Sequence, residues 1–118
     1  MRFRATDLNP DDKVLILGIP EAEFVRDAAA RLMHGMLVAI GDDESVGAAR
    51  REFRELVNVM CMPGSPDEIP WHDGFFTKVI DTRAGAWPNP DRVAAEISRV
   101  LASGSGGPHA AGGLPPAL

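Results

Sequence analysis

Apolar residues gather in short uninterrupted runs, separated by segments in which apolar positions recur at helical spacing. The first two runs, residues 14–17 and 36–40, each end at a glycine, Gly18 and Gly41. Runs of this length between turn residues are typical of strands buried on both faces of a parallel sheet. The pattern predicts four strands in all, at residues 14–17, 36–40, 57–62 and 75–82.

The first of three predicted helices follows the first strand. Pro20 suits the opening turn of a helix, where its missing N–H is not needed. Phe24, Ala28 and Leu32 then recur at helical spacing, and Gly35 ends the pattern.

Two further helices follow the second and fourth strands. Either Asp42 or Asp43 can cap a helix over residues 44–56. Asn89 is placed to cap the third helix, with Pro90 at its first position. Its apolar stripe is Val93, Ala94, Ile97, Val100 and Leu101.

The order of these elements indicates an α/β domain. Strands that alternate with helices favour right-handed crossovers and a parallel sheet. We place this domain at residues 13–102, after a Pro- and Asp-containing lead-in at 1–12. Residues 103–118 are rich in Gly, Pro and Ala and are predicted to be a disordered tail, because they can bury too little area to offset their ordering entropy.

Residues 69–101 carry a more specific signal, IPWHDGFFTKVIDTRAGAWPNPDRVAAEISRVL. This segment resembles the part of class I S-adenosylmethionine-dependent methyltransferases in which a Leu-Pro-Phe loop precedes the fourth strand and a helix ending in Arg-Val-Leu follows. With the first two strands, the resemblance covers about residues 13–101. The matching positions in the segment are Ile69, Pro70, Trp71, Asp73, Gly74, Phe76, Pro88, Pro90, Glu96, Arg99, Val100 and Leu101.

The resemblance implies a three-layer, Rossmann-like half-domain with four parallel strands in the order 3-2-1-4 and about three helices. The family's sheet has seven strands, so the domain is expected to be truncated after its fourth strand, with the outer edge of residues 75–82 unpaired. Lys78 interrupts that strand. It is interpreted either as a charge that blocks edge pairing or as an ordinary half-exposed lysine.

The same resemblance implies a site for S-adenosylmethionine at the ends of the first three strands, but most of the family's contact residues are replaced. The replaced residues are an acid in the first strand, two loop glycines, a ribose-binding acid and an adenine-binding Asp. Their counterparts here are Ile16, Pro20, Ala22, Gly41 and Ser65.

Three candidate cofactor-binding residues remain. Gly18 is retained, Asp42 lies one residue after the ribose position, and Asp67 lies two residues after the adenine position. Glu21 and Glu23 add negative charge where the cofactor's carboxylate would lie. No catalytic residue and no metal site are predicted.

These replacements predict a methyltransferase-like protein that is catalytically degenerate and acts as a binding or assembly module for a protein partner. One alternative is an active S-adenosylmethionine-dependent methyltransferase, alone or completed by a second chain. The other is a homodimer in which the edges of residues 75–82 pair across a twofold axis.

Composition narrows the remaining classes. The net charge of −5 argues against nucleic acid and anionic membranes as partners, because both bind basic surfaces.

Cys61 is the only cysteine and is interpreted as a small buried apolar residue. Trp71 and Trp87 flank the fourth strand, where packing under a loop is favoured over stacking on a base. No signal peptide or membrane span is predicted, so the protein is expected to be cytoplasmic.

Overall fold

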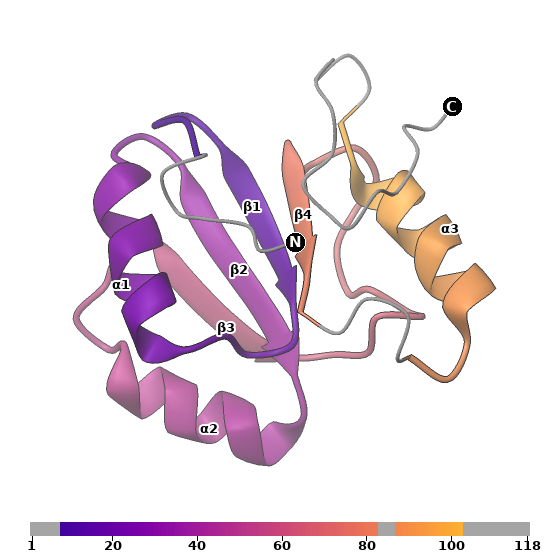
Figure 1. Ribbon diagram of the computed structural model, residues 1–118, viewed down its shortest axis with the longest axis horizontal. Helices are drawn as coiled ribbons and strands as arrows, with labels where there is room; N and C mark the ends of the chain where they lie inside the picture. The colour runs from indigo at the N-terminus through magenta and orange to yellow at the C-terminus, as the bar shows by residue number, and fades with distance from the viewer. Residues whose placement is uncertain (1–7, 83–86, 103–118) are drawn as a thin grey trace.

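Four parallel strands form one sheet in the computed structural model, which describes residues 8–82 and 87–102 (Figure 1). Their order is β3-β2-β1-β4, as expected from the sequence. The tail predicted at residues 103–118 lies outside the described residues. The strands are β1 (Lys13–Leu17), β2 (Met36–Gly41), β3 (Val59–Pro63) and β4 (Lys78–Asp81).

Three helices cover the two faces of this sheet and complete the predicted three layers. Helices α1 (Ala22–Arg31) and α2 (Asp43–Glu52) lie on one face, and α3 (Pro90–Val100) lies on the other (Figure 1). Alternate strand residues therefore enter different cores, as Ile16 packs with α1 and α2 whereas Leu17 packs with α3. Within the described residues, no helix is both long and apolar enough to cross a membrane.

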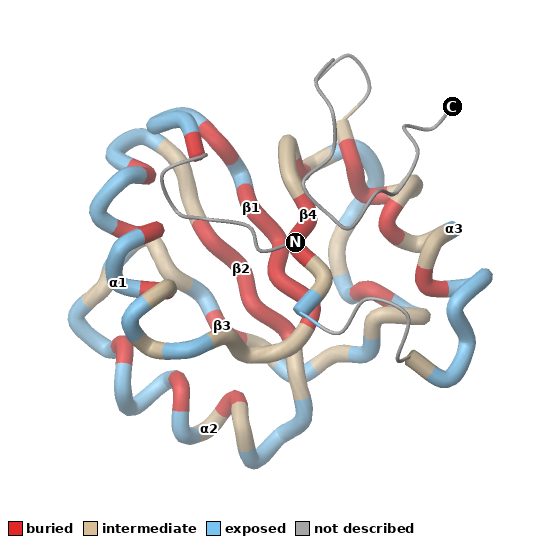
Figure 2. Tube along the Cα trace, viewed as in Figure 1, coloured by how far each residue is buried: buried red, intermediate tan, exposed pale blue. Residues whose placement is uncertain are grey.

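The centre of the sheet is buried on both faces, as its unbroken apolar runs predicted. All four residues of β1 from Val14 to Leu17 are fully buried, and Leu37 to Ile40 of β2 are nearly so (Figure 2). Because β1 pairs with both β2 and β4, it lies inside the sheet. Its alternate side chains pack into the cores on the two faces.

Several predicted boundaries were too wide. Helix α2 ends at Glu52, not at residue 56. Strand β3 begins at Val59, not at residue 57, and Val57 lies in the connecting turn with its side chain 99% exposed. The buried face of α1 is built on Val25 instead of the half-buried Phe24. Helical spacing alone could not decide between these neighbours.

The fourth strand also differs from its prediction, in a way that changes the sheet edge. Only Lys78–Asp81 is regular strand, and Phe76 forms a separate parallel bridge with Leu101. The Phe76 N–H donates to Val100 O (2.9 Å), and the Ala102 N–H donates to Phe76 O (2.7 Å). The expectation that the whole edge of 75–82 is unpaired was therefore wrong at its first residues, where the chain after α3 returns to the sheet.

Lys78 has a role that neither interpretation anticipated. Its Nζ lies 3.1 Å from Oδ2 of Asp12, whose side chain is only 8% exposed, at the amino ends of β1 and β4. The same carboxylate accepts hydrogen bonds from the Asn9 N–H and the Thr77 hydroxyl. Lys78 thus balances a buried charge inside the fold, and its ammonium does not extend freely from the edge.

Candidate ligand-binding site

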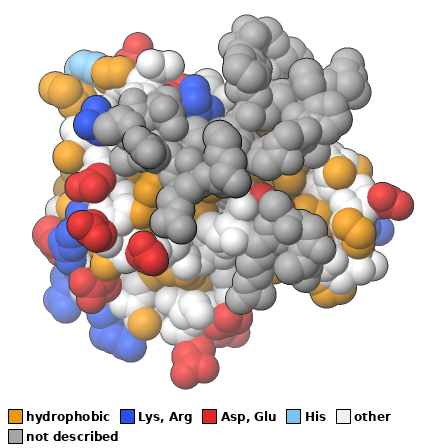
Figure 3. Space-filling view, in the orientation of Figure 1, with side chains coloured by type: hydrophobic (Ala, Val, Ile, Leu, Met, Phe, Trp, Pro, Cys, Tyr) orange, Lys and Arg blue, Asp and Glu red, His pale blue; other side chains and the backbone are white. Residues whose placement is uncertain are grey.

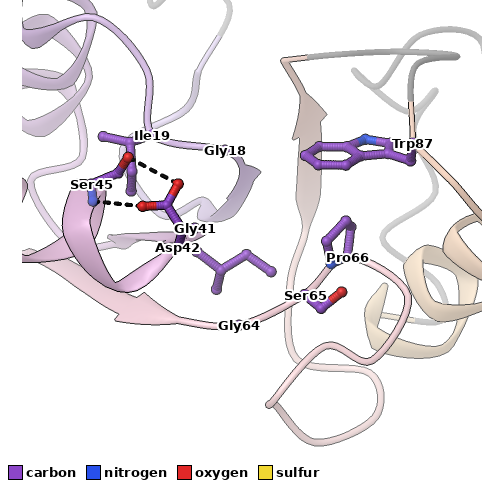
Figure 4. Close-up of a pocket in the computed structure, with 10 residues that line it drawn as sticks. Gly18, Ile19, Gly41, Asp42, Ser45, Gly64, Ser65, Pro66 and Trp87 are labelled. Carbon is purple, nitrogen blue, oxygen red and sulfur yellow. Dashed lines mark hydrogen bonds between the residues drawn. The ribbon is translucent and has the colours of Figure 1, made fainter.

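A pocket of about 330 Å³ opens at the carboxyl ends of β1, β2 and β3 (Figure 4). The strand order reverses between β1 and β4, and open α/β sheets bind ligands in the crevice at such a reversal. The residues that line it are Gly18, Ile19, Ile40, Gly41, Asp42, Ser45, Gly64, Ser65, Pro66 and Trp87.

Gly18 forms the turn that leads from β1 into the pocket. Its φ of 97° lies in the region that favours glycine. A Cβ at this position would collide with Oγ1 of Thr82, whose hydroxyl donates to Leu17 O (2.6 Å). The predicted site residue Gly18 therefore lies in the pocket, and its backbone shape also requires glycine.

Two backbone donors on the pocket floor are already used within the protein. The Gly18 N–H donates to Ile40 O (2.8 Å), and the Gly64 N–H donates to Gly41 O (3.1 Å). Pro20, which follows the lining residue Ile19, has no N–H. These groups extend the hydrogen bonding of the sheet, so they are not free to hold an anion.

Asp42, the second predicted site residue, also lies in the pocket. It is the N-cap of α2, where Oδ1 accepts from the Ser45 N–H (2.8 Å) and Oδ2 from the Ser45 hydroxyl (3.1 Å; Figure 4). These hydrogen bonds from the backbone and then the hydroxyl of Ser45 lower the pKa of Asp42, so the side chain is a carboxylate at neutral pH. Each oxygen can accept one further hydrogen bond.

Asp67, the third predicted site residue, does not line the pocket. Its Oδ1 accepts from the Ser65 hydroxyl, its Oδ2 accepts from Asn89 Nδ2 (3.0 Å), and its carbonyl accepts from Arg92 Nε (3.2 Å). The Ser65 and Asn89 contacts lower the pKa of Asp67. Asp67 therefore connects the turn after β3 to α3. Asn89 occupies the predicted N-cap position, but its side chain makes no capping hydrogen bond; its amide nitrogen donates to Asp67.

Apolar side chains form the walls of the pocket. Ile19 follows β1, and Pro66 and Trp87 face it from the loops on the opposite side (Figure 4). Ile40 of β2 also lines the pocket. The Trp87 Nε1–H donates to Asp81 Oδ1 (2.7 Å), which fixes the indole at the end of β4. Trp87 was predicted to pack under a loop and was not assigned to the pocket, since it lies 46 residues beyond Gly41 and only the crossover brings the two together.

The charge around the pocket is negative in the part of the chain that the structure describes. Asp42 is the charged residue of the lining, which contains no Lys, Arg or His. Acidic side chains also gather over α1 (Figure 3), and Glu21, its N-cap residue, is exposed. Ile16 adds no polar group, because it is fully buried in the core beneath α1.

Comparison with known proteins identifies the fold and leaves the family open. No protein-family model matches the sequence, and no curated protein matches it. Among solved structures, a SAM-dependent methyltransferase from Aquifex aeolicus aligns with 80% of this chain at 19% identity and a TM-score of 0.72. A geranyl diphosphate methyltransferase in complex with SAM aligns with 82% at 19% identity and a TM-score of 0.71.

A third similar structure has a different activity in its name. The [4+2]-cyclase SpnF aligns with 84% of this chain at 22% identity and a TM-score of 0.70. The chain spans 52%, 40% and 38% of these three proteins, respectively. It therefore has the Rossmann-like fold found in part of S-adenosylmethionine-dependent methyltransferases, as its sequence indicated.

Proposed function

We propose that this chain, with its methyltransferase-like fold, is a binding module that does not transfer methyl groups by itself. The observation that carries this proposal is the chemistry of the pocket. Its amide donors at Gly18 and Gly64 are used by the sheet, and its described lining offers no cation. A cofactor that ends in a carboxylate would lose hydration there without meeting a cation.

S-adenosylmethionine fits the residues present in one half only. The apolar walls and the Asp42 carboxylate suit a ring and the hydroxyls of a nucleoside. For the amino acid half, the turn after β1 offers Pro20, which cannot donate, and the exposed carboxylate of Glu21. If bound, the cofactor would supply an electrophilic methyl group. In the described residues, Asp42 would hold its ribose, and the lining has no cationic side chain for its carboxylate.

The comparisons are compatible with a role other than methyl transfer. One protein of the same fold is described as a cyclase. Since a fold does not fix a reaction, the pocket chemistry has more weight than the likeness.

Calorimetric titration with S-adenosylmethionine and S-adenosylhomocysteine tests the proposal. We expect no saturable heat below millimolar ligand. Saturable binding at micromolar concentration, with methyl transfer to any acceptor, would contradict it.

A second candidate, an active S-adenosylmethionine-dependent methyltransferase alone or completed by a second chain, has one observation in its favour. The pocket lies at the strand ends where such a cofactor is expected, with Gly18 and Asp42 both in its lining. Under this candidate, Asp42→Ser should weaken S-adenosylhomocysteine binding at least about tenfold. The helix should remain capped, because serine caps as well as aspartate. Asp43→Ser, which changes the adjacent exposed carboxylate, is the matched control.

A further inference from the structure

We infer that the pocket is a site for a neutral or cationic nucleoside and that it selects against a ligand carboxylate. This inference rests on the proposed function, because it names the ligand class that a module with this pocket would accept. It follows from three properties of the described lining: its apolar walls, the Asp42 carboxylate, and the lack of a Lys, Arg or His side chain.

The walls suit a flat, weakly polar ring. Pro66 and Trp87 face Ile19 across the pocket (Figure 4), and the hydrogen bond to Asp81 holds the indole of Trp87 in position. A ring between these surfaces would bury apolar area on both faces, and an aromatic ring would add stacking on the indole. The volume of about 330 Å³ is at the lower end of the range for small-molecule sites.

The polar group at the edge of this pocket is an acceptor. Ser45 donates to each oxygen of Asp42, and because this carboxylate is exposed, a ligand can also reach it as a donor. Two neighbouring hydroxyls, as on a ribose, or an amine would match this pair. A ring joined to a sugar therefore satisfies both the walls and the carboxylate.

A ligand carboxylate finds no such match. The N–H groups of Gly18, Ser45 and Gly64 are bonded to other protein atoms. The Ser65 hydroxyl donates to Asp67. Arginines described nearby are also engaged elsewhere, since Arg50 binds Cys61 O and Arg92 binds Asp67 O. A carboxylate would therefore be desolvated beside Asp42 without a cationic partner, whereas a cation would be attracted.

The test compares S-adenosylmethionine with decarboxylated S-adenosylmethionine, which differ by one carboxylate, and with neutral 5′-methylthioadenosine. Amide shifts of Gly18, Gly41 and Gly64 in an NMR titration of the isotope-labelled protein report binding in this pocket. We expect the decarboxylated compound to bind at least tenfold more tightly than the parent, and 5′-methylthioadenosine to bind at least as tightly as the parent.

Two outcomes would overturn the inference, and they differ in what they say of the proposed function. If S-adenosylmethionine binds at micromolar levels and as tightly as its decarboxylated form, the inference fails, and the proposed function fails with it where methyl transfer to an acceptor accompanies that binding. If none of the three compounds shifts the glycine amides at millimolar concentration, the inference fails alone. The module would then remain without a nucleoside ligand.

A charge-neutral variant tests whether Asp42 causes the discrimination against a ligand carboxylate. Asp42→Asn keeps a good N-cap and removes the negative charge, so we expect the affinity ratio of the decarboxylated to the parent compound to fall at least threefold. Asp43→Asn, on the next exposed carboxylate, is the matched control and should leave the ratio unchanged. An equal response of the two variants, or none, would rule out Asp42 as the source of the discrimination.

Discussion

Asp12 shows how much one residue can contribute outside the pocket. Burial raises the pKa of Asp12, but the Asn9 and Thr77 hydrogen bonds and the Lys78 ammonium outweigh this effect, so its pKa lies below the usual value. A lowered folded-state pKa means that the carboxylate stabilises the fold above its unfolded pKa of about 3.9. That stability is lost as the pH falls through the folded value.

Asp12→Asn should therefore lower the free energy of unfolding at pH 7 by about 1–3 kcal/mol, because Lys78 loses its charged partner. The difference from the parent protein should shrink at pH 3, where the parent carboxyl is also becoming protonated. Urea unfolding at both pH values measures it. Asp11→Asn, on the exposed neighbour, should change little, and an equal loss at both pH values would contradict the role of the charge.

Two glycines should respond to alanine with opposite signs. Gly18→Ala combines a positive φ with a collision at Thr82, and should lower the free energy of unfolding by about 1–3 kcal/mol. Gly47 lies inside α2, where an added Cβ would meet an Arg51 guanidinium nitrogen at 4.0 Å and so has room. Gly47→Ala should therefore raise the free energy of unfolding by up to about 1 kcal/mol. Thermal unfolding of both variants is the measurement, and a stable Gly18→Ala protein would contradict the proposed backbone requirement.

At the scale of elements, Arg99 joins α3 to the loop before β4. It donates to the Glu96 and Asp73 carboxylates and to the carbonyls of Trp71 and Ile69. Glu96 and then Asp73 raise the pKa of Arg99, so it stays charged. Five residues that carried the sequence resemblance therefore meet in one hydrogen-bonded cluster. The cluster holds the loop in place and lies outside the pocket lining.

Arg99→Lys should destabilise the protein by about 1–3 kcal/mol, because an ammonium cannot reproduce the planar set of donors. Urea unfolding measures the loss. Arg31→Lys, at the exposed end of α1, should have little effect and controls for the exchange of side chains. Equal stability of the two variants would show that the cluster does not stabilise the fold.

At the scale of the whole molecule, the two sheet edges limit how copies could associate. On β3, every second residue points its backbone N–H and C=O groups away from β2, toward the outer edge of the sheet. There Arg50 Nε donates to Cys61 O (2.9 Å), and Pro63 has no N–H. On β4, Phe76 is already paired with Leu101, which leaves the four residues Lys78–Asp81. Each edge therefore offers only a short pairing surface in the described chain.

The homodimer through the edge of residues 75–82 stays a prediction, and sedimentation at tens of micromolar protein tests it. Because the described edge of β4 is short, we expect a monomeric mass, which would count against the dimer. Lys78→Val is not a clean probe of this edge, since it would leave the Asp12 carboxylate unpaired. A dimeric mass would support an assembly role.

Much of the fold could be predicted from the sequence because it depends on local patterns. Apolar runs that end at Gly18 and Gly41 define buried parallel strands, and Asp42 three residues before Ser45 defines a helix cap. Boundaries were less certain, as at residue 57, because a turn held by the Asn58 side chain depends on contacts with α1.

The sequence by itself determined the strand and helix order, the central core, and the placement of Gly18 and Asp42 at strand ends, since each follows from residues close along the chain. Tertiary structure decided what each polar group binds. In the fold, Asp67 accepts hydrogen bonds from Ser65 and Asn89 and does not line the pocket. Trp87 lines the pocket, and Lys78 pairs with Asp12. The physical reason is that a hydrogen bond or ion pair needs its partner within about 3 Å. For these residues the partners come from separate elements that only the folded sheet brings together.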